Sequence, residues 1–219
     1  MRDESKTKWE QTQMVNWKKD EDKIASFFER FNLDVRDLYK HLMSINYDRI
    51  QIVCYLLSKI NKAIRVCDFL DELEKNNPED VDVIKIYILV SHAEISSRSL
   101  GKKGKAIELI KEFFNPVASS LKHKIRSSLV NKKGSNLSFA DILYKIRCEY
   151  THEGNYTGSI FKIKEDERFL WIRFKSGDKY LYGECHLTYK EFVKFYMEAL
   201  IENIKEFSNY GKQNKQYKE

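Results

Sequence analysis

Glycine and proline are scarce in this chain. Its 219 residues include only 8 Gly and 2 Pro, the residues that most often interrupt regular elements. This scarcity predicts long, mostly helical elements. No apolar run reaches the roughly 18 residues that a membrane-spanning helix needs, and the start Met1-Arg2-Asp3-Glu4 has no signal-peptide core. We therefore expect a cytoplasmic protein that does not contact a membrane.

Several familiar site motifs are also missing. The 4 cysteines (Cys54, Cys67, Cys148 and Cys185) are scattered without a Cys-x-x-Cys pair, which favours free thiols over a disulfide framework. The chain has no glycine-rich phosphate loop, no His-Glu-x-x-His and no Gly-x-Ser-x-Gly elbow. These absences argue against P-loop nucleotide hydrolysis, zincin proteolysis and α/β-hydrolase chemistry. We expect no metal and no cofactor.

Apolar periodicity divides the chain into helices. Hydrophobic residues make up 42% of the chain and aromatics 13%, which is typical of a globular protein. Spacings of three and four predict helices over 24–31, 35–43, 50–73, 80–100, 105–114, 117–129 and 139–152, and a last helix that begins with a capping box at Thr188-Tyr189-Lys190-Glu191. We expect an N-terminal helical extension over 1–49, a helical domain over 50–208 and a polar tail over 209–219.

The period changes to two between residues 157 and 186. Alternation over 159–164, 169–174 and 180–186, with a turn at Ser176-Gly177-Asp178, predicts a three-stranded antiparallel meander. The expected fold is therefore mainly α: an antiparallel helical bundle with a small β-meander inserted before the last helix.

Positive charge is concentrated in one segment. The formal net charge is +6, and residues 101–134 contain nine Lys and Arg against two Glu. Such a patch suits a polyanion, although a solvated lysine-rich surface would look the same. The candidate nucleic-acid-binding residues are Lys102, Lys103, Lys122, Lys124, Arg126, Lys132 and Lys133.

Arg147 and His152 are the candidate catalytic pair. They lie five positions apart near the end of a predicted helix that Gly154 closes. Histidine exchanges protons near neutral pH, and arginine binds phosphate oxygens, so together they can cleave RNA without a metal. Positions five apart on an α-helix point about 140° away from each other. The two side chains therefore converge only at a frayed helix end or across two copies of the chain.

The motif in its context resembles the HEPN superfamily. Long helices precede Arg147-Cys148-Glu149-Tyr150-Thr151-His152, which matches the family's Arg-x(4–6)-His motif at its shortest spacing, and a last helix follows. The β segment before that helix is similar to the Apea-like branch. The resemblance implies a helical-bundle fold, metal-independent endoribonuclease activity, a homodimer in which the motifs meet, and a role as a toxin or phage-defence effector with an antitoxin or neighbouring regulator.

Other readings of the same residues stay open. The family usually has a polar residue after the arginine, where this chain has Cys148, so a non-catalytic dimer that binds RNA or a protein partner is the alternative. We assign supporting roles to His92, Cys148 and Glu153; for His92 we expect a structural role, with contact to the substrate as the alternative. A zinc site formed by Cys148, His152, Cys185 and His186 is a rival arrangement, because two of them are spaced i, i+4 on one helix.

Overall fold

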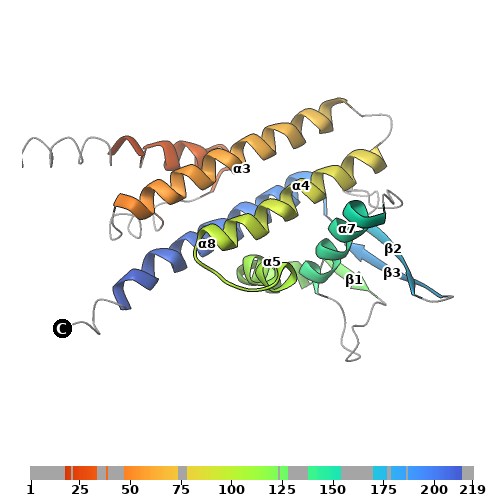
Figure 1. Ribbon diagram of the computed structural model, residues 1–219. Helices are drawn as coiled ribbons and strands as arrows, with labels where there is room; N and C mark the ends of the chain where they lie inside the picture. Colours follow the sequence, from red (N-terminus) through yellow and green to blue (C-terminus); the bar gives the residue numbers. More distant parts are fainter. Residues whose placement is uncertain are drawn as a thin grey trace, which may run out of the picture. The chain divides into compact units, whose positions relative to one another are not determined.

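The computed structural model describes residues 18–20, 22–33, 38, 47–73, 78–122, 124–127, 138–153, 170–176, 179–185 and 187–213. The chain is mainly helical, as predicted. Its elements are α3 (Tyr47–Leu73), α4 (Pro78–Ser99), α5 (Ala106–Phe114), the 3-10 turn η1 (Asn115–Val117), α6 (Ala118–Lys122), β1 (Ile125–Ser127), α7 (Phe139–Glu153), β2 (Leu170–Ser176), β3 (Lys179–Cys185) and α8 (Tyr189–Gln213) (Figure 1). Among the described helices, none combines the length and apolar character needed to cross a membrane.

The chain forms two compact units. Unit 1 comprises residues 1–61 and 201–219, and unit 2 comprises residues 62–200. Two helices, α3 and α8, contribute residues to both units. The boundaries at 49 and 208 that the sequence indicated stay a prediction.

In unit 1, a short amphipathic helix packs its apolar side inward. Residues 18–20 and 22–29 are helical, and Ile24, Phe27 and Phe28 are buried, as the spacing predicts. The Arg30 guanidinium donates a hydrogen bond to the Asn61 side chain on α3 at 2.6 Å. Apart from Leu38, the helix expected over 35–43 lies outside the described residues.

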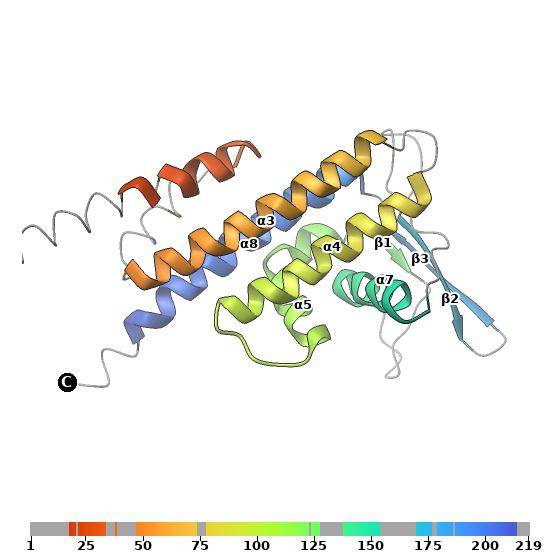
Figure 2. The ribbon, with the colours of Figure 1, turned by 45° about the horizontal axis from the view of Figure 1, so that its top comes forward.

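Unit 2 is built around α4, which contacts both α5 and α7 (Figures 1 and 2). An aromatic cluster forms its core: Phe113 and Phe114 on α5, Phe139 on α7, and Phe192 and Tyr196 on α8. The Phe113 and Tyr196 ring centroids are 4.8 Å apart, and those of Phe114 and Phe139 are 5.6 Å apart with perpendicular planes. The edge-to-face contact between Phe114 and Phe139 joins α7 to the core of the unit.

Side-chain caps determine where α7 and α8 begin. The Ser138 Oγ accepts a hydrogen bond from the Asp141 backbone N–H at 3.2 Å, and the Ser138 N–H donates to the Asp141 carboxylate at 3.0 Å. The capping box predicted at the last helix is confirmed. The Thr188 N–H donates to the Glu191 carboxylate at 2.8 Å, and the Glu191 N–H donates to the Thr188 Oγ1 at 3.1 Å.

The predicted β-meander is wrong. The sheet has the order β1-β3-β2, with both pairings antiparallel. Its edge strand β1 comes from residues before α7, so the sheet is not three consecutive strands inserted before the last helix. In both views the β2–β3 hairpin projects beside α7 (Figures 1 and 2). The strand expected over 159–164 lies outside the described residues.

The helix predicted over 117–129 is also wrong in its second half. Helix α6 ends at Lys122, and Ile125–Ser127 pair with Gly183–Cys185 instead. The edge of β3 offers backbone hydrogen bonds that helical periodicity alone cannot reveal. Ile125 is β-branched and Ser127 is a weak helix former, so little local preference opposes the strand.

Candidate functional site

The predicted motif residues Arg147 and His152 lie on two different sides of helix α7. Phe139, Ile142, Leu143 and Ile146 are buried, and the Tyr150 ring lies 4.7 Å from that of Tyr87 on α4. The helix runs to Glu153, so His152 lies in its last turn. Arg147 and His152 therefore point about 140° apart. Both arrangements that would bring them together, a frayed helix end and a second copy of the chain, stay predictions.

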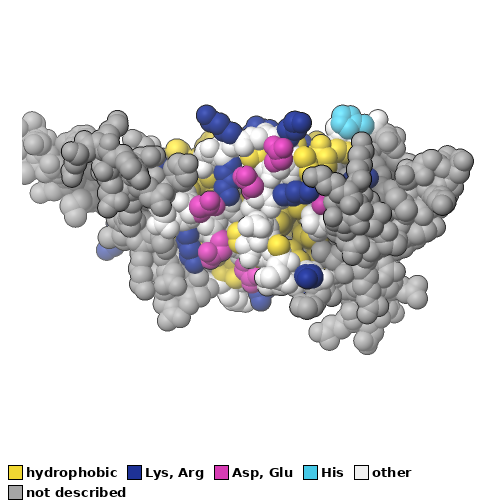
Figure 3. All heavy atoms as spheres, turned by 90° about the horizontal axis from the view of Figure 1, so that it is seen from below, with side chains coloured by type: hydrophobic (Ala, Val, Ile, Leu, Met, Phe, Trp, Pro, Cys, Tyr) yellow, Lys and Arg dark blue, Asp and Glu magenta, His cyan; other side chains and the backbone are white. Residues whose placement is uncertain are grey.

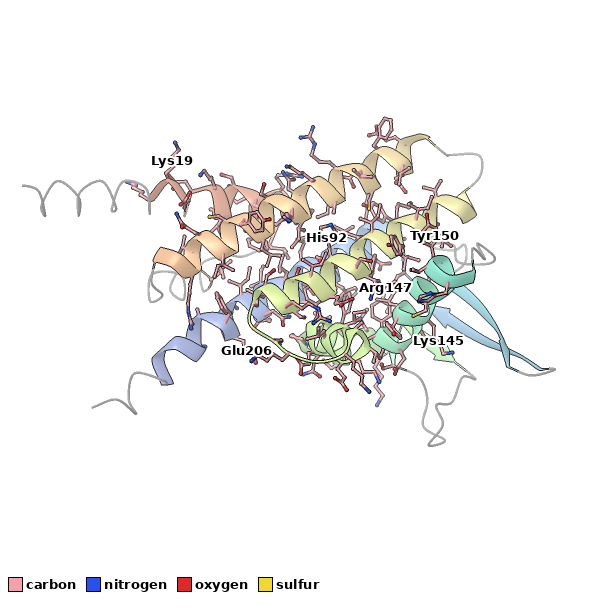
Figure 4. All side chains as sticks on the ribbon, viewed as in Figure 1. Lys19, His92, Lys145, Arg147, Tyr150 and Glu206 are labelled. Carbon is pink, nitrogen blue, oxygen red and sulfur yellow. The ribbon has the colours of Figure 1, made fainter. Side chains whose placement is uncertain are left out.

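Arg147 forms an ion pair with Glu94 on α4. Its Nη1 lies 2.6 Å from the Glu94 Oε2, and the side chains are 24% and 14% exposed. The other carboxylate oxygen accepts hydrogen bonds from the Arg98 Nε and Nη2 at 3.1 and 2.9 Å. Figure 4 shows Arg147 on the side of α7 that faces α4. One carboxylate thus lies between two guanidinium groups, and these three residues keep a net positive charge at the surface of unit 2.

The residues that surround Arg147 on α7 are polar. Cys148 is half-buried and free, and a hydrogen bond with its side chain, followed by its charge, raises the pKa of the Tyr144 hydroxyl. The Thr151 hydroxyl donates to the Arg147 carbonyl at 2.8 Å. His152 is exposed in the last turn, where solvent and a bound anion can reach its ring.

The predicted supporting residues His92 and Glu153 lie on two different helices, α4 and α7. His92 is half-buried on α4 (Figure 4), two positions before Glu94, and its carbonyl accepts a hydrogen bond from the Ser96 hydroxyl at 2.6 Å. Glu153 is the final residue of α7, and its side chain lies outside the described part of the chain. A catalytic contribution from His92 or Glu153 stays a prediction.

The predicted basic residues lie on several different elements in the described part of the chain. Lys102 and Lys103 follow α4, and Lys122 is exposed at the end of α6. Lys124 pairs with the capping residue Glu191 at 2.7 Å, and Lys111 pairs with Asp141 at 2.6 Å.

Of the remaining basic candidates, Arg126 belongs to β1, opposite Glu184, and Lys132 and Lys133 lie outside the described residues. On the surface seen in Figure 3, Lys and Arg side chains alternate with Asp and Glu.

No group of three or more His, Cys, Asp or Glu side chains suited to a metal occurs among the described residues. Cys148 and His152 share α7, and Cys185 ends β3. His186 and the Cys185 side chain lie outside the described part, so the zinc arrangement stays a prediction. Cys54, Cys67 and Cys148 are free thiols, as predicted for them.

Sequence reasoning missed Glu94 and Arg98 as members of the site. Both were available as an i, i+4 charge pair on a predicted helix, a spacing that usually marks an exposed surface pair. Only the packing of α7 against α4 reveals that the same carboxylate also holds Arg147.

Comparisons with known proteins leave the site without a relative. No family model matches the chain, no curated protein is similar in sequence, and no solved structure matches its fold.

Proposed function

We propose that the protein is a metal-independent endoribonuclease of the HEPN type, with Arg147 and His152 as its catalytic residues. The observation that supports this most is the fixed Arg147 guanidinium. Glu94 holds one of its nitrogens, while the sharing of that carboxylate with Arg98 leaves positive charge for a phosphate. An RNA substrate would be met in the cytoplasm.

The proposed reaction uses the ordinary chemistry of the two groups. The imidazole of His152 removes the proton from a ribose 2′-hydroxyl, whose oxygen attacks the adjacent phosphorus. The bond to the 5′-oxygen breaks, and that oxygen takes a proton from water. Arg147 stabilises the negative charge that develops on the phosphate oxygens. The products are a 2′,3′-cyclic phosphate and a 5′-hydroxyl.

A second copy of the chain would bring an Arg147 and a His152 side chain together. A two-fold axis places the same surface from each chain opposite itself, so His152 of one copy could face Arg147 of the other. The surface of α4 beside the site suits such an interface. Ile84, Ile88 and Ile95 recur at helical spacing there and are incompletely buried, Ile95 being 42% exposed.

Cleavage of RNA in the presence of EDTA tests the proposal. His152→Ala and Arg147→Ala should each lower the cleavage rate by about 10²- to 10⁴-fold, the usual contribution of a positioned proton-transfer or charge-stabilising group. Lys145→Ala removes an exposed cation from the same helix (Figure 4) and should keep the wild-type rate. Activity that EDTA abolishes and a divalent metal restores would refute the mechanism.

A non-catalytic RNA-binding or partner-binding dimer is the second candidate. It is favoured by the separation of Arg147 and His152 on one continuous helix and by Cys148 beside the arginine. It predicts binding that weakens steeply with salt as counterions are released, without new product ends. An antitoxin or neighbouring regulator would be a partner under either candidate, consistent with a role in toxicity or phage defence. Single-turnover cleavage that His152→Ala abolishes would exclude this second function.

A further inference from the structure

Unit 1 contains a large cavity that the proposed ribonuclease chemistry does not use. Its volume is about 980 Å³, and it lies between the helical residues 18–20 and 22–29 and the middle of α3. All of its described lining residues belong to unit 1. Binding cavities for small molecules usually measure about 300–1,000 Å³, so this space is ample for a ligand.

The floor of the cavity is apolar. Ile24 and Phe27 line it from one side and Leu57 from α3 on the other, and these three residues are 1%, 7% and 4% exposed. Cys54 also lines it, and its Sγ contacts the Asp20 carbonyl at 3.8 Å. Burial, and then the charge of Asp20, raises the pKa of the Cys54 thiol to about 11, although Lys23 lowers it. The thiol is therefore neutral at physiological pH and presents an uncharged surface to a ligand.

The rim of the cavity is basic. Lys18, Lys19, Lys23 and Arg30 line it against one carboxylate, that of Asp22. Lys23 is partly neutralised by Asp20 at 2.7 Å, whereas Arg30 donates its hydrogen bond to the uncharged amide of Asn61. Lys18 and Lys19 are exposed, and Lys19 projects outward from its helix (Figure 4). The rim thus offers positive charge at the mouth of an apolar space.

We infer that this cavity binds a small anionic amphiphile, with the apolar body of the ligand against Ile24, Phe27 and Leu57 and its anionic head group at Lys18, Lys19 and Arg30. An apolar body alone would leave the basic rim unused. A head group alone, such as free phosphate, would gain little from exposed lysines, because water and salt screen them. The combination explains both parts of the lining.

Two fluorescent probes separate the two contributions. 1-Anilinonaphthalene-8-sulfonate carries a sulfonate, and N-phenyl-1-naphthylamine has the same aromatic body without charge. The sulfonated probe should bind saturably and about tenfold more tightly than the neutral one, as expected for charge complementarity at the rim. Equal affinities, or no saturable binding of the sulfonated probe, would overturn the inference.

Substitutions around the cavity test whether the probes bind there. Lys18→Glu with Lys19→Glu should weaken binding of the sulfonated probe about tenfold and leave the neutral probe within about twofold. Ser58→Trp from α3 and Ser26→Trp from the opposite wall should each weaken both probes by filling the space. Lys190→Glu with Lys194→Glu makes the same charge change on exposed lysines of α8 and should change neither affinity. Binding that is insensitive to both tryptophan variants would refute the site.

Competition then identifies the ligand chemistry. Dodecyl phosphate or dodecanoate should displace the sulfonated probe, and the stronger competitor identifies the preferred head group. Inorganic phosphate should compete at least about tenfold more weakly, because it lacks the apolar body. Equal competition by inorganic phosphate would show that the floor contributes nothing, and the inference would fail. None of these outcomes bears on RNA cleavage, so the cavity and the ribonuclease proposal are tested separately.

Discussion

Glu94 is the residue on which the geometry of the candidate site depends most. It is the only carboxylate that an ion pair links to Arg147 in the described part of the chain, and it also binds Arg98. With an exposed fraction of 14%, it lies between a surface pair, worth about 0–1 kcal/mol, and a buried pair, whose disruption costs about 3–5 kcal/mol. Without its charge, the two guanidinium groups would face each other uncompensated.

We therefore predict that Glu94→Gln lowers the free energy of unfolding by about 1–2 kcal/mol, an intermediate cost between exposed and buried pairs. Urea denaturation followed by circular dichroism measures this change. Glu202→Gln provides the control: it removes the charge from a 50% exposed glutamate paired with Lys205 at 2.7 Å, and we expect a change below about 0.5 kcal/mol. Equal effects of the two substitutions would contradict a structural role for the Glu94 bridge.

Lys85 is a residue whose burial the sequence alone does not predict. Its side chain is 3% exposed, and its ammonium group pairs with Asp71 and with the buried Asp82 and lies 4.5 Å from the Tyr189 ring. A lysine on a predicted helix is assigned by default to the exposed side, because an unpaired buried charge is costly. Partners from α3 and α8 remove that cost, and only the tertiary packing brings them to Lys85.

At the scale of elements, a capping box can be predicted from the sequence because it is a local pattern. Thr188 and Glu191 are three residues apart, so their hydrogen bonds require no information from the rest of the chain. The long helices are predictable for the same reason, since their apolar periodicity is read within one segment. The pairing of β1 with β3 joins segments that are distant in the sequence, so no local pattern predicts it.

The cap of α8 gives a prediction with a pH dependence. Burial alone would raise the pKa of Glu191, but hydrogen bonds from Lys124 and from the Thr188 backbone outweigh it, and the pKa is lowered below the ordinary 4.5. The charged form is therefore favoured in the folded state, and its contribution to stability is complete above pH 4.5. That contribution is lost as the pH falls through the lowered pKa.

We expect Glu191→Gln to be less stable than the wild type at pH 7 and to approach it in strongly acidic solution. Thr188→Ala should cost about 1 kcal/mol at both pH values, because a hydroxyl cap does not titrate there. Thermal unfolding midpoints at a series of pH values measure both effects. A Glu191→Gln deficit that stayed constant on acidification would show that the carboxylate charge is not the stabilising feature.

At the scale of the whole molecule, we propose that two chains together form the site. The continuity of α7 through His152 directs the two catalytic candidates to different sides. The arginine, the histidine and their helix were all visible in the sequence. Their divergence follows only from where the helix ends, which is among the least reliable features of any sequence-based assignment.

We predict that the protein sediments at micromolar concentration with about twice the 26.1 kDa mass of one chain. Ile95→Lys, on the half-exposed face of α4, should shift it to the monomer, because a like-charged pair would meet across the two-fold axis. Ser58→Lys introduces the same side chain at an exposed position of α3 and should leave the dimer intact. A monomer that cleaves RNA at the wild-type rate would contradict a two-chain site.

The antiparallel pairing of β1 with β3 has a consequence for the order in which the protein forms. The β2–β3 hairpin pairs neighbours in the chain, whereas β1 must wait for a partner on the order of 60 residues further on. On the ribosome, α7 is complete before β3 exists. Helix α7, which carries Arg147 and His152, therefore emerges before the sheet is assembled, and docking of β1 is expected to be among the last steps of folding.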